Sequence, residues 1–207
     1  MAITLNGGTG VITGVSVGGL ADGVVDSGTL ATNSVDSAEV IDGAVDTSHL
    51  ATATRGKVVQ VVHTHVTAHV TGTTVSVRDG SIPQITEGNE VMTLAITPTS
   101  TSNKLLVHVI ALGNASHANR NMTMALFNTD VHSTNAISTT GWLSENTDWE
   151  ITNPLVHYLT APTTSETTFR VRLGSHTTGT SMINGFGSTQ LYAGTAGSTM
   201  TIWEIAV

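Results

Sequence analysis

The chain has 207 residues, carries a formal net charge of −8 and contains no cysteine. Its seven scattered Lys and Arg residues form no basic patch, which disfavours nucleic acid and anionic membrane surfaces as ligands. The absence of cysteine excludes disulfides, thiolate metal sites and cysteine nucleophiles. Charged residues are only 11% of the chain and Thr and Val are abundant, which argues against disorder and predicts an all-β protein.

Residues 1–19 consist of short Ile, Leu and Val pieces separated by glycines. They lack the basic start and unbroken apolar core of a signal peptide, and no stretch approaches the roughly 18 apolar residues of a membrane span. The alternation from Val11 to Val17 is typical of a strand. We interpret residues 1–19 as an attachment segment that becomes ordered by adding strands to a partner, with a frayed terminus as the alternative.

Residues 20–56 contain a ten-residue repeat, in which VDS, VDS and VDT begin at Val25, Val35 and Val45. An apolar residue falls at every fifth position, a spacing that aligns side chains on neither a helix nor one face of a strand. Such a repeat can bury its apolar residues only against neighbouring chains. We therefore predict a trimeric stalk. The residues predicted to pack at its axis are Leu20, Val25, Leu30, Val35, Val40, Val45 and Leu50.

Residues 57–207 change to short strands separated by turn residues, which predicts a β-sandwich head domain, jelly-roll-like in form. Thr167–Gly174 alternates apolar residues with two arginines, as a strand with one buried face does. Lys104–Gly113 is apolar on both faces and is therefore central or at a subunit interface. The predicted strands are Lys57–Thr71, Val75–Arg78, Val91–Thr97, Lys104–Gly113, Met122–Phe127, Leu155–Ala161, Thr167–Gly174, Thr189–Ala193 and Thr199–Ala206.

Aromatic and acidic side chains mix in one stretch of the head, which contains Trp142, Glu145, Asp148 and Trp149. Flat aromatic faces beside carboxylates suit sugar binding, so we predict that these four residues contact a receptor. Two alternatives remain at this stage. The tryptophans would fill the core or an interface, or a pair of carboxylates would hydrolyse a glycosidic bond.

Three histidines lie close together in the first predicted strand of the head, at His63, His65 and His69. An H-x-H pair facing a threefold axis could supply six ligands to one metal ion. The alternative is a solvated or interface face that carries Thr and His together. The aspartates of the repeat are interpreted as caps of turns, with calcium binding as the alternative. We assign no metal, cofactor or catalytic residue.

Five segments carry a family resemblance: MAITLNGGTGVITGVSVGGL, the VDS and VDT repeat, GKVVQVVHT, SIPQITEGNEVMTLAITPTSTSNKLLVHV and STMTIWEIAV. They resemble tail-fibre proteins of bacteriophages, notably those of marine and cyanobacterial phages, over essentially the whole chain. The resemblance implies a homotrimer that docks through residues 1–20 on a baseplate, tail or capsid protein. It also implies that a β-sandwich head meets the host surface.

The resulting hypothesis is a non-enzymatic fibre or spike of a virion, made in the bacterial host cytoplasm and located on the tail or capsid surface. Its heads would attach to host cell-surface polysaccharide. Because the stalk is short, a capsid or tail decoration protein with no receptor is the second hypothesis. A third, a polysaccharide depolymerase, would need clustered acids in a groove, and the sequence offers only residues 145–150.

Overall fold

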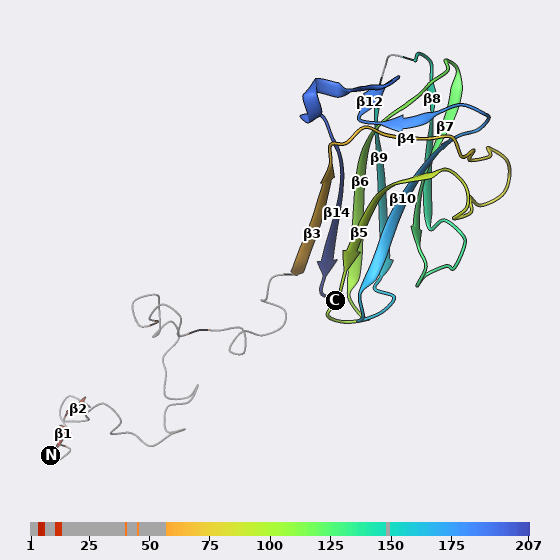
Figure 1. Cartoon of the computed structure of the whole chain (residues 1–207). Helices are drawn as coiled ribbons and strands as arrows, with labels where there is room; N and C mark the ends of the chain where they lie inside the picture. The colour runs from red at the N-terminus through yellow and green to blue at the C-terminus, as the bar shows by residue number, and fades with distance from the viewer. Residues whose placement is uncertain (1–3, 7–10, 14–39, 41–44, 46–56, 148–149) are drawn as a thin grey trace. The chain divides into compact units, whose positions relative to one another are not determined.

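The computed structural model describes residues 4–6, 11–13, 40, 45, 57–147 and 150–207 (Figure 1). The chain divides into two units, Met1–Arg55 and Gly56–Val207. In the first unit, β1 (Thr4–Asn6) pairs antiparallel with β2 (Val11–Thr13). No helix in the described ranges is long and apolar enough to cross a membrane.

The predicted stalk falls almost entirely outside the described residues. Its two described members, Val40 and Val45, have side chains that are 39% and 48% exposed. The other five are Leu20, Val25, Leu30, Val35 and Leu50. Trimeric packing of the repeat therefore stays a prediction.

The second unit is built from strands and one short 3-10 helix. The strands are β3 (Val58–Val66), β4 (Val70–Gly72), β5 (Asn89–Ile96), β6 (Lys104–Ala115), β7 (Arg120–Asn128), β8 (Ser138–Ser144), β9 (Ile151–Thr160), β10 (Thr167–Ser175), β11 (Ser181–Ile183), β12 (Gly185–Phe186), β13 (Thr189–Gln190) and β14 (Ser198–Ile205), and the helix is η2 (Leu191–Gly194).

Most of these strands form two antiparallel sheets packed face to face, and β12 and β13 pair only with each other (Figure 1). The first sheet has the order β3-β14-β6-β9, and the short strands β11 and β4 extend it beyond the end of β14. The second sheet has the order β5-β10-β7-β8. Each sheet therefore pairs early strands of the unit with late ones, which is the strand order of a jelly roll. The expected all-β, jelly-roll-like sandwich is confirmed.

The core lies between the two sheets and is lined by alternate residues of each strand. In β10, Phe169, Val171 and Leu173 are fully buried, while the two arginines between them point outward. This confirms the one-sided burial predicted for that strand, because residues two apart share a face. In β6 only one of the two apolar faces turns into the core. The inward residues include Leu105, Val107 and Val109.

Several predicted elements are wrong. Val75–Arg78 is not a strand but part of the connection between β4 and β5. Lys57–Thr71 is two strands, which join different partners, β14 and β11. Thr189–Ala193 is largely the helix η2, whose Tyr192 and Ala193 have positive φ values. Strand β8 was not predicted, because its sequence STTGWLS lacks the apolar alternation by which strands are recognised.

Candidate functional site

The residues predicted to contact a receptor do not form one surface within the described part of the chain. Trp142 of β8 is partly buried and packs against the core. A Cβ atom built on Gly113 of β6 would lie 2.7 Å from Cζ2 of the indole, so the ring rests directly on that glycine. Glu145 is exposed beyond the end of β8, whereas Asp148 and Trp149 lie outside the described residues. These contacts support the packing alternative for Trp142, and receptor contact by the four residues stays untested.

The histidine pair of β3 lies on the outer face of the first sheet. His63 and His65 are both exposed, and the Nδ1 atom of His63 is 2.8 Å from Oγ1 of Thr201. His69 is not on this strand, and its ring packs near Gly185 instead. Among the described residues, no three His, Asp or Glu side chains are grouped as a metal-ion site.

On the outer face of the first sheet, residues align in rows across β3, β14, β6 and β9; one row is apolar throughout, and the next two mix His and Thr with apolar residues. These rows contain no Asp, Glu, Lys or Arg. Val61, Val156 and Tyr158 are 51%, 57% and 56% exposed. Three rows define what we call the association face: Val61, Trp203, Leu106 and Tyr158; His63, Thr201, His108 and Val156; His65, Thr199, Ile110 and Pro154.

The second sheet is covered on part of its outer face by the connection between β4 and β5, residues 73–88 (Figure 1). This connection is held by backbone hydrogen bonds at both ends. The Ser76 amide donates to the Ser175 carbonyl of β10 at 2.9 Å, and the Ala136 amide donates to the Pro83 carbonyl at 2.9 Å. Residues 73–88 therefore form a fixed wall beside strands β7 and β8.

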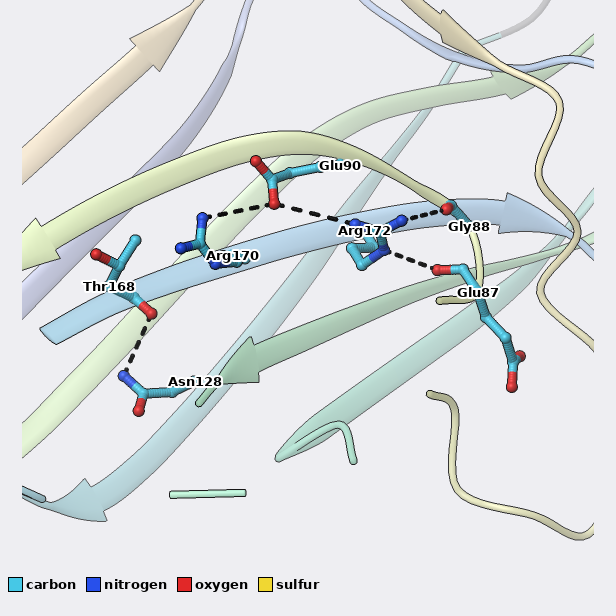
Figure 2. Close-up of polar contacts among 7 residues, drawn as sticks. All are labelled: Glu87, Gly88, Glu90, Asn128, Thr168, Arg170 and Arg172. Atoms are coloured by element: carbon cyan, nitrogen blue, oxygen red, sulfur yellow. Dashed lines mark hydrogen bonds and ion pairs between the residues drawn. The ribbon is translucent and has the colours of Figure 1, made fainter. Parts of the chain in front are cut away.

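The Glu87 carboxylate holds this connection in shape. It accepts hydrogen bonds from the backbone amides of Val77 (3.1 Å) and Gln84 (3.2 Å). From the sheet below, Arg172 donates to the carbonyls of Glu87 (2.9 Å) and Gly88 (2.8 Å), as Figure 2 shows. Gly88 has φ +64°, and a Cβ atom there would lie 2.9 Å from the backbone of Leu173, so only glycine fits this close approach.

Two adjoining hollows lie between residues 73–88 and the outer face of β7 and β8. We call them together the Arg78 groove, because both are lined by Arg78, Thr123 and Thr139. The first, of about 390 Å³, also contains Asn121, Gly141, Trp142 and Leu143 in its lining, so one of the residues predicted to contact a receptor borders it. The second, of about 430 Å³, is mainly apolar, with Val77, Ile82, Pro83 and Ile137 in its lining, and the acidic Asp79 borders it as well. Volumes of this size can hold a small ligand.

The sequence offered little sign of this groove. The sequence predicts that Arg78 ends a strand and that Asp79 begins a turn. Asn121, the hydrogen-bond partner of Arg78, lies 43 residues away along the chain. The Nη1 atom of Arg78 donates to Oδ1 of Asn121 at 3.1 Å, which joins the connection to β7. The Asp79 carboxylate accepts from the Ser81 hydroxyl and amide, and these bonds lower the pKa of Asp79.

One carboxylate is fully buried inside the sandwich. Glu204 of β14 accepts hydrogen bonds from Asn103 Nδ2 (2.6 Å), Gln60 Nε2 (2.6 Å) and the Thr99 amide and hydroxyl (both 2.8 Å). Burial by itself would raise the pKa of Glu204, but the hydrogen bonds outweigh burial and lower it. This carboxylate links β3, β14 and the turn after β5, so its role is structural.

The inward face of β9 carries a second shifted group. Burial lowers the pKa of His157, because desolvation disfavours the imidazolium form. Its backbone partner across the sheet is Val107.

No known protein family matches the chain, and neither does any curated protein. Solved structures with a likeness include the Eiger TNF of S. frugiperda, at 12% identity and a TM-score of 0.32, over 70% of this chain and 93% of that chain. They also include a family two carbohydrate esterase of Cellvibrio japonicus, at 10% identity and a TM-score of 0.28, over 72% of this chain and 36% of that chain. A third is the VP2 subviral particle of infectious bursal disease virus, at 12% identity and a TM-score of 0.31, over 72% of this chain and 38% of that chain. At such scores these likenesses carry no argument about ligands or partners.

Proposed function

We propose that this chain is a non-enzymatic fibre or spike protein of a bacteriophage virion. Three copies associate, residues 1–20 dock on a baseplate, tail or capsid protein, and the jelly-roll heads attach to polysaccharide on the host surface. The sequence resemblance to phage tail fibres supports the virion role, and the association face supports the oligomer.

The association face is the observation that carries the proposal. It places Trp203 and Leu106 at its centre and Tyr158 at its margin, with no charged residue in its three rows. Its first row is apolar throughout, and an apolar surface row of this kind marks an interaction site, because leaving it in water costs free energy. A second copy of the same chain is a fitting partner, since the patch is uncharged while the chain as a whole carries −8.

The edge strand β3 favours the same partner. It pairs with β14 on one side only and contains neither Pro nor a charged residue. Open apolar edges invite pairing with other chains, and natural proteins usually protect them. The opposite edge strand, β9, carries Pro154, which is such a protection.

The described carboxylates support a non-enzymatic role, because those with partners serve the fold. Glu204 is enclosed by four donors, and Glu87 holds the connection over β7 and β8. Glu90 lies 3.6 Å from Arg170 and 4.0 Å from Arg172. Carboxylates engaged in this way are poorly suited to act as a general acid or nucleophile in glycoside hydrolysis.

Native mass spectrometry and light scattering of the full chain test the oligomer. We expect a mass of about 64 kDa, three times the 21.4 kDa of one chain. A Val61→Lys variant places a charge on the association face and should shift the population towards the monomer. Leu143→Lys is the matched control, because Leu143 is similarly exposed at 41% but lies on the other sheet. A wild-type monomer, or a V61K variant as trimeric as the wild type, would contradict the proposal.

A further inference from the structure

The Arg78 guanidinium is oriented by Asn121 and has no carboxylate partner among the described residues. Its Nη1 atom donates to Oδ1 of Asn121, and within the described part of the chain no carboxylate lies within ion-pair distance of it. The outward arginines of β10, Arg170 and Arg172, both face Glu90 instead. A guanidinium has five N–H donors in a planar fork, so most of the donors of Arg78 remain available to a ligand.

The rest of the first hollow suits a polyhydroxylated ligand. Thr123 and Thr139 line it, and neither side-chain hydroxyl makes a hydrogen bond within the described residues; Thr139 is exposed, whereas Thr123 is only 9% exposed. Exposed Leu143 provides an apolar surface beside them. Gly141 contributes no side chain, and a Cβ atom there would lie 3.0 Å from the Met122 carbonyl oxygen. Hydroxyls, an amide and an apolar strip together match the hydroxyl groups and C–H face of a sugar ring.

The groove is formed before any ligand binds. Its outer wall, residues 73–88, is fixed by the Glu87 carboxylate and by the two hydrogen bonds from Arg172 (Figure 2). Its floor is the paired strands β7 and β8, with Thr123 opposite Gly141. A preformed site loses less conformational entropy on binding than one that must be ordered by its ligand.

We propose that the Arg78 groove binds a carboxylate-bearing sugar unit of an acidic polysaccharide. The Arg78 guanidinium binds the sugar carboxylate. Ring hydroxyls form hydrogen bonds with the hydroxyls of Thr139 and Thr123 and with the Asn121 amide. Leu143 contacts the C–H face of the ring. The mainly apolar second hollow takes the next unit of the polymer. This inference rests on the proposed function, because it names the receptor class and places its site in a groove whose lining includes Trp142.

The net charge of the chain means that general electrostatic attraction cannot account for binding of an acidic polymer. With a formal charge of −8, the protein repels polyanions at long range, so retention of an acidic polymer requires a local site. Each single contact would be weak, and three heads on one fibre would strengthen binding by multivalency.

The test is affinity electrophoresis of the full-length protein in gels that contain alginate, polysialic acid, dextran sulfate or neutral dextran. We expect retardation by alginate or polysialic acid and none by neutral dextran. Arg78→Gln should weaken retardation about tenfold or more, because a charge-assisted fork is lost. Arg78→Lys should also weaken it, since an ammonium cannot bind a carboxylate in a bidentate way. Thr139→Val should weaken it several-fold.

Arg170→Gln is the matched control, because it removes the same charge from the same sheet outside the groove, and it should bind as the wild type does. Thermal unfolding of each variant confirms that the fold is kept. Three results would overturn the inference: no acidic polymer is retained more than dextran, R78Q and R170Q bind equally, or dextran sulfate is bound as well as the carboxylated polymers.

The mass measurement separates this inference from the proposed function. If the protein is a trimer that does not bind acidic polymers, the groove assignment is overturned and the fibre proposal is unaffected. A monomer whose weak alginate binding disappears in R78Q supports the groove and overturns the trimer.

Discussion

Arg172 donates a hydrogen bond from Nη2 to the carbonyl oxygen of Gly88 at 2.8 Å (Figure 2). This contact joins the middle of β10 to the last residue of a sixteen-position connection, residues 73–88, that crosses the outer face of the same sheet. A side chain of the strand beneath it therefore helps to hold the wall of the candidate groove, together with the Glu87 carboxylate.

Replacing Arg172 by Met should loosen the connection while the sandwich stays folded. Two hydrogen bonds to backbone carbonyls are lost, which costs about 1–3 kcal/mol of the free energy of unfolding. Hydrogen–deuterium exchange should rise in residues 73–88 more than in β6. Arg170→Met is the control, because Arg170 has only the ion pair with Glu90 at 3.6 Å, which is partly exposed and weak. Equal exchange in both variants would contradict the assigned role.

Trp142 should matter more for stability than its exposed neighbours do. Trp142→Ala removes an indole that packs on Gly113 and the core, so we expect a loss of about 3 kcal/mol in the free energy of unfolding. Trp142→Phe should cost less, because the buried Nε1 donor has no hydrogen-bond partner among the described residues to lose. Urea denaturation measures both. A W142A variant as stable as the wild type would show that the ring does not pack as described.

Acid should destabilise the head through Glu204. Because the pKa of Glu204 is lowered in the folded state, its stabilising effect is complete above the unfolded value of roughly 4.3 and is lost as the pH falls through the folded value. Glu204→Gln should lower the free energy of unfolding at pH 7 by about 2–4 kcal/mol, because an amide donor then faces other donors. Its stability should also change less with pH below about 4.3. Glu166→Gln in an exposed loop is the control, and an E204Q variant with wild-type acid sensitivity would refute this role.

A separate pH effect should come from His157 at milder acidity. Its pKa is lowered by burial, so the unfolded chain binds more protons than the folded one once the pH falls below the unfolded value of roughly 6.5. Stability should therefore decline from pH 7 towards pH 5, and His157→Gln should flatten that decline. His132→Gln, at an exposed histidine, should leave it unchanged. Thermal unfolding at half-unit pH steps measures the effect, and identical slopes for H157Q and the wild type would disprove it.

The strands with clear alternation could be predicted from the sequence, and those without it could not. Strands β6 and β10 were predicted within two residues of their observed ends, because apolar residues repeat along them with little interruption. Strand β8 was missed, because Ser, Thr and Gly occupy both of its faces and give no sign of an inward side. The direction of Trp142 could not be predicted for the same reason.

The candidate groove depends on residues that only the packed sheets bring together. Arg78 meets Asn121 because the connection after β4 folds over β7, and no local pattern in either segment predicts that crossing. The residues predicted from the sequence to contact a receptor lie instead within 142–149, where aromatic and acidic residues are neighbours in sequence.

The sequence alone determined the all-β class and the inward and outward faces of β10, because alternation along a strand is a local property. The structure places Glu204 on the inward side of β14, between apolar neighbours. Only the tertiary structure decided that this carboxylate is satisfied, by Gln60, Thr99 and Asn103. It likewise decided that Arg78 has no carboxylate partner among the described residues. Partners so far apart in sequence are selected by the free energy of packing the whole sandwich, which no single segment contains.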